Sequence, residues 1–270
     1  MAEENITLDP EYAELIIAVN KLKDIVAEKI SERDMLAFHV IPEIENSYLL
    51  KIGFLENDVF KANLKLIKIR RKIELCKECK KLGIPIKEEE IDNKLNVEFE
   101  NIEEEYMELQ SDYIYDVEDE LTDSASSELL KLLNIIYKNL IKKLSPLINS
   151  NNTRMDNKLY ELLEKAYREL DLSMMSKLQS ICEQEKSDSS FIIGDVKTLR
   201  KAKKRYQELI DENEEIILNI KCSEAFDKKR ILEDENLLRR TKEEINEEIS
   251  NLDKEYKRAE KDLKKILNIM

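Results

Sequence analysis

The stretch LLKLLNIIYKNLIKKLSPLINSNNTRMDNKLYELLEKAYREL, residues 129–170, decides how we interpret the chain. Its apolar residues recur at helical spacing on both sides of a loop of about ten residues, which predicts two amphipathic helices. The first helix carries Leu129, Leu133, Ile136, Leu140 and Leu144 on one face, and the second carries Leu159, Leu162, Leu163, Ala166 and Tyr167. Lys138, Lys142 and Lys143 fall outside the apolar face of the first helix, and the loop contains Ser145, Pro146 and Leu147.

This segment resembles the J-domain of DnaJ-type co-chaperones. The shared features are a tyrosine and basic residues on the helix before the loop, a proline in the loop, and the pattern Ala-Tyr-x-x-Leu at Ala166–Leu170. The resemblance implies that the basic helix and the loop dock on a DnaK-type chaperone and stimulate its ATP hydrolysis, while the module itself catalyses nothing. The residues expected to dock are Lys138, Lys142, Lys143, Ser145, Pro146 and Leu147.

J-domains carry a His-Pro-Asp triplet in this loop, where the chain has Ser145, Pro146 and Leu147. Ser145 replaces a ring that can donate, accept and stack, and Leu147 replaces a charged acceptor. Charge-assisted contacts contribute about 1.5–3 kcal/mol each, so the loss of two would weaken docking by orders of magnitude. We therefore expect residues 122–190 to form a degenerate J-like module that keeps the fold without the signalling.

Long helices are expected before this module, in residues 1–121. Asp9 and Pro10 form a helix start, and Pro42 is expected to break or kink that helix. A second helix ends at Gly83. Its apolar residues repeat every seven positions, as in a coiled coil, with Ile52, Val59, Leu66 and Ile73 in one position and Leu55, Ala62, Ile69 and Cys76 in the other.

Charge predicts how the second helix pairs. Residues 61–81 hold nine basic and two acidic residues, whereas residues 88–120 hold fifteen acidic residues and one lysine. Folding the acidic segment back on the basic one sets opposite charges against each other, which favours an antiparallel hairpin. The alternative interpretation of the acidic run is a surface for a basic partner protein.

Residues 191–270 predict another antiparallel hairpin. Leu199, Tyr206, Asn213 and Ile220 share one heptad position, Cys222 and Ser223 turn the chain, and the last helix repeats Ile231, Leu238, Ile245, Leu252, Ala259 and Ile266. A polar residue between two helices can specify register or oligomeric state. Asn213 either does this or lies at a wet edge.

Some bacterial DnaJ-like proteins embed a J-domain between long coiled-coil helices, and this chain is similar in its organisation. The matching motifs are KIGFLE at Lys51–Glu56 and RRKIEL at Arg70–Leu75. We therefore expect an all-α protein in which long coiled-coil hairpins flank a small J-like module. The boundaries of the expected domains are 1–121, 122–190 and 191–270.

Composition supports this fold class and excludes several functions. The chain has 270 residues with 3 Gly, 4 Pro, no Trp and 39% charged residues, a composition that disfavours sheets. No apolar run of about 18 residues exists, so no membrane span is expected. The acidic N-terminal segment lacks the features of a secretory signal, which makes a cytoplasmic location the expectation. With a pI near 4.9, nucleic acid is not an expected ligand.

Catalytic and metal chemistry have weak support. The pair Cys76 and Cys79 has the spacing of a zinc or redox motif, but it lies on a predicted helix with no second pair at ligand spacing. His39 is the only histidine, and it precedes Pro42 as an ordinary residue near a helix end. Neither a catalytic triad nor a phosphate-binding loop can be assembled, so we expect no enzymatic activity, no metal and no cofactor.

Two functions remain. The first is a non-enzymatic adaptor or scaffold that binds other proteins. It would also self-associate if its apolar heptad faces are larger than the other helices of the chain can cover. The alternative is an active J-domain co-chaperone that recruits a DnaK-type chaperone through the basic helix.

Overall fold

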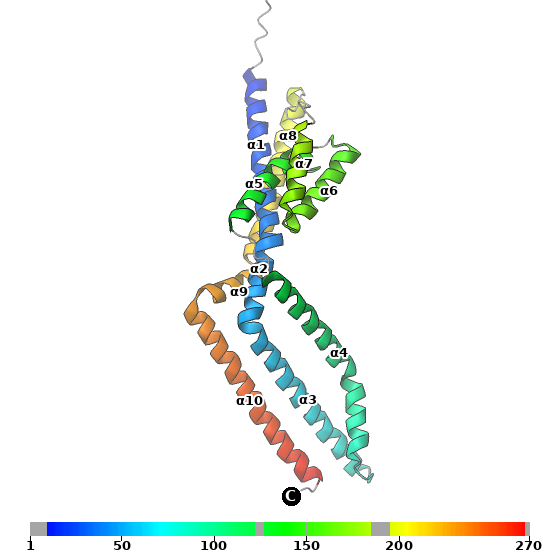
Figure 1. The fold of residues 1–270 in the computed structure, drawn as a ribbon. Coiled ribbons are helices and arrows are strands. Elements are labelled where there is room, and N and C mark those ends of the chain that lie inside the picture. The colour runs from blue at the N-terminus through cyan, green and yellow to red at the C-terminus, as the bar shows by residue number, and fades with distance from the viewer. Residues whose placement is uncertain (1–9, 122–126, 150, 185–194, 268–270) are drawn as a thin grey trace, which may run out of the picture. The chain divides into compact units, whose positions relative to one another are not determined.

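The computed structural model describes residues 10–121, 127–149, 151–184 and 195–267, except for the side chains of residues 105 and 107–121. All secondary structure in these ranges is helical, which confirms the all-α prediction. The helices form two compact units (Figure 1). Of the described residues, those within 1–43 and 125–226 form unit 1, and those within 44–124 and 227–270 form unit 2.

This division differs from the predicted boundaries at 121/122 and 190/191. Each unit joins segments that are far apart in the sequence, because the apolar face of each long helix is covered by a distant helix. In particular, the N-terminal helix belongs to the same unit as the predicted J-like module.

Unit 1 is built around one apolar core. Its helices are α1 (Pro10–Met35), α5 (Ser127–Leu144), α6 (Arg154–Arg168), α7 (Leu172–Gln184) and α8 (Val196–Lys221). Helix α1 packs along α8 and against α5, and α5 also contacts α6 and α7. The core includes Ile30 of α1, Leu133 of α5, Leu163 of α6, Met175 of α7 and Leu199 of α8.

Local sequence signals explain where several helices begin and end. Thr153 and Asp156 form a capping box, in which each side chain accepts from the backbone N–H of the other residue, so α6 begins at Arg154. Helix α3 (Phe54–Lys81) ends as predicted at Gly83, whose φ is 68°. Ile84 N–H donates to the Cys79 carbonyl at 2.9 Å, which closes the helix end.

The helix does not end at Pro42. A π-helical turn, Leu36–Val40, directly precedes the short helix α2 (Ile41–Tyr48), and a second π turn covers Leu49–Gly53. Proline lacks an N–H and its ring crowds the carbonyl four residues earlier. Pro42 cannot donate a backbone hydrogen bond. The π turn just before it already interrupts the regular α-helical hydrogen-bonding pattern, so the missing donor falls at an existing irregularity.

Unit 2 is organised around α3. Its other long helices are α4 (Glu88–Leu121) and α10 (Glu235–Leu267), which follows the short helix α9 (Glu224–Glu233). Helix α3 packs against α10 and also against α4, and therefore lies between them (Figure 1). Ile73 and Cys76 of α3 share a core with Leu95 of α4 and Leu263 of α10.

The structure contradicts the predicted C-terminal hairpin. Helix α8 packs on α1 in unit 1, whereas α10 packs on α3 in unit 2. The heptad faces of α8 and α10 are thus covered by α1 and α3, respectively. Asn213 on α8 is buried at the α1–α8 contact and not at a wet edge: its side-chain oxygen accepts from Arg33 at 3.1 Å and its amide donates to the Leu209 carbonyl at 2.7 Å.

Candidate functional site

The loop after α5 is the predicted docking element, and its first residue is completely buried. Ser145 has no exposed surface, and its backbone N–H continues the helical pattern by donating to the Ile141 carbonyl at 2.9 Å. Its hydroxyl oxygen accepts from the Leu147 N–H at 3.3 Å. Ser145 thus fixes the loop from inside.

Two asparagines close the end of α5. The amide of Asn149 donates to the carbonyls of Lys142 and Lys143 at 3.0 and 2.9 Å, and the amide of Asn152 donates to the Leu144 carbonyl at 2.5 Å. These bonds satisfy carbonyls that a helix end leaves without partners. The buried Lys23 of α1 adds a bond of 3.0 Å to the Asn149 side-chain oxygen. The loop is therefore tied to both α5 and α1.

Pro146 and Leu147 are the exposed residues of the predicted triplet. The Leu147 side chain is 37% exposed, and its carbonyl accepts from Arg205 of α8 at 2.9 Å. The tip of the loop thus presents one proline ring and one partly exposed aliphatic side chain, on a backbone held by α8.

The predicted docking lysines are all engaged within unit 1. Lys138 pairs with Glu28 and Lys142 with Asp24, both at 2.7 Å and both across to α1. Lys143 donates to the Cys182 carbonyl at the end of α7 at 3.3 Å. The hydrogen bond from Lys138 lowers the pKa of the Glu28 carboxyl. The structure brings these lysines close to the loop, and it also gives each of them a role in holding helices together.

A buried polar network in unit 1 was not foreseen from the sequence. Asp34 of α1 is 2% exposed; one of its oxygens accepts from Arg33 and the other accepts from the Tyr137 hydroxyl at 2.9 Å. The Tyr137 ring stacks on Tyr167 with a centroid distance of 3.8 Å, and the Tyr167 hydroxyl donates to Asn134. The only signal for this network in the sequence is that helical periodicity puts Asp34 on the buried face of its helix. Such networks are costly unless satisfied, and here they fix how α1, α5 and α6 meet.

His39 lies next to this network. It occupies the first π turn, and its ring meets the edge of Tyr167 with a centroid distance of 4.8 Å. Burial lowers the pKa of the His39 imidazole below its ordinary value of 6.5. His39 is thus a packed residue at a helix irregularity.

The cysteine pair shows no metal-site geometry. Cys76 is buried and Cys79 is partly buried, both are free thiols, and burial raises the pKa of Cys76. Within the described ranges, no three or more residues of the types His, Cys, Asp and Glu gather as metal ligands would. Cys76 contributes instead to the core between α3, α4 and α10.

Ion pairs flank the apolar contact between α3 and α4. Lys68 binds Glu103, Lys72 binds Asp92, and Arg71 holds both carboxylate oxygens of Glu98 at 3.0 and 3.3 Å. An open hollow of about 480 Å³ lies on one side of this pair, lined by Ile67, Arg70, Arg71, Glu74, Glu98, Phe99 and Ile102. Ile67 is 51% exposed and Ile102 is 44% exposed, so the lining of the hollow combines exposed apolar side chains with charges of both signs.

No helix in the described part of the chain is both long enough and apolar enough to cross a bilayer. Comparison with known proteins identifies no relative, since no protein-family model, curated protein or solved structure matches the chain.

Proposed function

We propose that the protein is a non-enzymatic adaptor that binds other proteins, built on a degenerate J-like module that no longer stimulates a DnaK-type ATPase. The observation that carries the proposal is the hollow between α3 and α4, with its half-exposed Ile67 and Ile102. Exposed apolar side chains accompanied by polar and charged ones are typical of protein-binding surfaces.

The chemistry of the hollow indicates what would fill it. A partner helix with one or two aliphatic residues on its inner face would cover Ile67 and Ile102, at about 25 cal/mol for each Å² of apolar surface removed from water. Its flanking polar residues would need charges of both signs, because Arg70 and Arg71 lie beside Glu74 and Glu98. An amphipathic helix of mixed charge fits this description.

Site-specific photo-crosslinking tests the proposal. A benzophenone amino acid at position 67 or 102, in the full chain and in the cells that make it, is expected to give adducts of discrete mass. Val97 is the matched control, since it lies on the same helix as Ile102, is apolar and 72% exposed, and does not line the hollow. Equal adducts at position 97, or none at 67 and 102, would contradict the proposal.

The J-like module supports a scaffold role more than a signalling role. The resemblance rests on short motifs, and the lysines that would meet a chaperone already bind Glu28, Asp24 and the Cys182 carbonyl. Docking through them would require those contacts to be exchanged. The exposed positions of Pro146 and Leu147 are the observation that favours the alternative, an active co-chaperone.

Steady-state ATP hydrolysis by a DnaK-type chaperone separates the two functions. We expect the natural chain to give no stimulation. Stimulation that disappears in Pro146→Ala would establish the alternative, because Pro146 is exposed and its replacement leaves the buried contacts of Ser145 intact. Restoring a histidine at position 145 is a poor test, since Ser145 has no exposed surface and a larger side chain would be overpacked there.

A further inference from the structure

The basic and acidic residues on the outer face of α8 occupy separate halves of the helix. Leu199, Tyr206, Ile210 and Ile217 are buried on its inner face. The opposite face, at spacings of three and four residues, consists of exposed residues only: Lys197, Lys201, Lys204, Glu208, Asp211 and Glu215. Its first half is basic and its second half is acidic.

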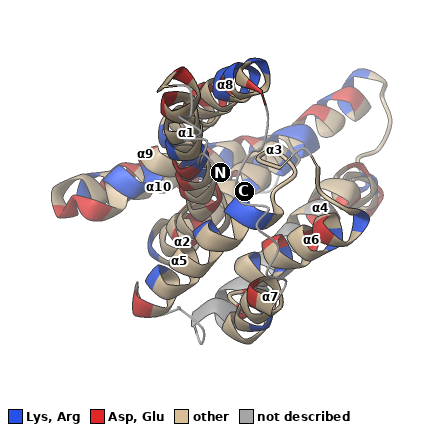
Figure 2. Cartoon of the chain, turned by 90° about the horizontal axis from the view of Figure 1, so that it is seen from above, with Lys and Arg blue, Asp and Glu red and all other residues tan. Residues whose placement is uncertain are grey.

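The same segregation holds over residues 196–217, whereas Lys221 in the last turn is basic and pairs with Glu32 at 2.8 Å. Residues 196–205 contain six basic residues and no acidic one, and residues 206–217 contain five acidic residues and no basic one. Figure 2 shows blue Lys and Arg turns on α8. Opposite charges three or four residues apart on a helix can pair with each other. In α8 the sequence limits such pairing to the boundary between the halves, where Lys204 meets Glu208 at 3.5 Å.

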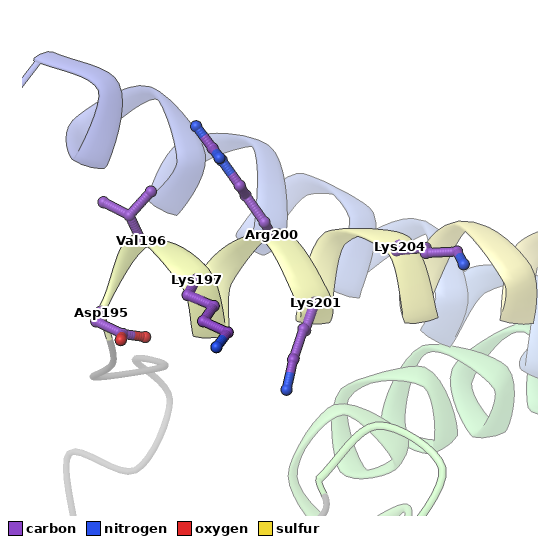
Figure 3. A pocket seen from close by; sticks show the side chains of 6 residues that line it. All are labelled: Asp195, Val196, Lys197, Arg200, Lys201 and Lys204. Carbon is purple, nitrogen blue, oxygen red and sulfur yellow. The ribbon is translucent and has the colours of Figure 1, made fainter.

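Only some of these charged residues of α8 form ion pairs with other helices. Arg200 reaches toward α1 and pairs with Glu11, and Glu214 pairs with Lys29 at 2.9 Å. By contrast, Lys197 and Lys201 point away from α1 (Figure 3). The basic half also borders an open hollow of about 640 Å³, lined by Asp195, Val196, Lys197, Arg200, Lys201 and Lys204. Within the described part of the chain, Lys197, Lys201 and Glu215 form no ion pair.

We propose that this face binds the same face of a second copy of the chain, with the two α8 helices antiparallel. A two-fold axis at the level of residue 206 sets Lys197 opposite Glu215, Lys201 opposite Asp211 and Lys204 opposite Glu208 of the other copy. Symmetry then repeats each pair, since the interface is isologous. A parallel arrangement would set like charges against each other, so charge complementarity specifies the antiparallel one.

The interaction is reversible and depends on salt. Exposed ion pairs contribute little individually, and salt screens them over a distance of about 8–10 Å at physiological ionic strength. Association therefore strengthens at low salt. This surface lies on α8 and is not used by the proposed adaptor function, which concerns the hollow between α3 and α4.

Sedimentation velocity of the full chain tests the proposal with charge-swapped variants. Lys197→Glu with Lys201→Glu and Lys204→Glu makes the face wholly acidic, and Glu208→Lys with Asp211→Lys and Glu215→Lys makes it wholly basic. Each variant alone is expected to associate at least tenfold more weakly than the natural chain at low salt. An equimolar mixture is expected to form a heterodimer at least as tight as the natural dimer.

The design separates loss of the interface from loss of the fold. Acidic residues near a helix start and basic residues near its end suit the helix dipole, so the swaps should leave helix content unchanged by circular dichroism. Lys254→Glu with Lys257→Glu and Lys261→Glu on α10 changes the net charge as much as the acidic α8 variant does and should leave association intact. A natural chain that stays monomeric at low salt would overturn the proposal. So would a mixture that fails to associate, or an α10 variant that loses association equally.

Discussion

Replacing Tyr137 by Phe is expected to destabilise unit 1 by about 2 kcal/mol. Asp34 is 2% exposed and has two acceptor oxygens, one bound by Arg33 and one bound by the Tyr137 hydroxyl at 2.9 Å. The substitution leaves the second oxygen buried without its described partner, while the ring and its stacking on Tyr167 remain. A hydrogen bond to a charged group contributes about 1.5–3 kcal/mol, which sets the magnitude.

Tyr167→Phe is the matched control. Its hydroxyl donates at 3.3 Å to the side-chain oxygen of Asn134, which also accepts from the Ser31 hydroxyl at 2.5 Å. Because Asn134 is neutral and keeps another donor, the expected loss is about 0.5–1 kcal/mol. The two variants thus remove the same atom from two stacked rings and differ in the acceptor that is left behind.

Hydrogen exchange followed by mass spectrometry measures both effects within the correct unit. Peptides from α5 report the opening of unit 1, and peptides from α3 serve as an internal reference in unit 2. A loss of about 2 kcal/mol corresponds to exchange roughly thirtyfold faster in the most protected amides of α5. The reasoning is refuted if Tyr167→Phe accelerates exchange as much as Tyr137→Phe does, or if α3 peptides respond equally.

Three further predictions follow from the same unit. Thr153→Ala removes the hydroxyl half of the α6 capping box and should cost about 1 kcal/mol, measured by thermal unfolding against a Ser replacement that keeps the cap. Burial lowers the pKa of His39, so the single imidazole in the chain should titrate by NMR with a pKa below 6.5. Below pH 6.5 the unfolded chain therefore binds more protons than the folded one, and the free energy of unfolding falls as the pH decreases. Burial also raises the pKa of Tyr137, Tyr160 and Tyr167 above 10.0, so the free energy of unfolding should fall above pH 10. In a titration at 295 nm these phenols should ionise only as helix is lost, and smooth ionisation of all tyrosines in the folded protein would contradict this.

The predicted docking residues illustrate what a local pattern reveals. Helical spacing correctly put Leu133, Leu140 and Leu163 on buried faces, because an amphipathic stripe is written in the local sequence. The same pattern predicted that Lys138 and Lys142 form an exposed basic face available to a partner protein. Their partners Glu28 and Asp24 lie on α1, more than a hundred residues earlier, where no local pattern reveals them.

The sequence by itself determined the helical class, the closure of α3 at Gly83 and the attraction between basic α3 and acidic α4. Each of these depends on neighbours in the chain, or on a charge contrast large enough to need no geometry. Tertiary structure alone decided that α1 pairs with α8 and α10 with α3, and that Asp34 and Asn213 are buried. The physical reason is that a heptad pattern specifies which face of a helix avoids water but not which other helix covers it. That choice depends on the shape and polar groups of both faces together.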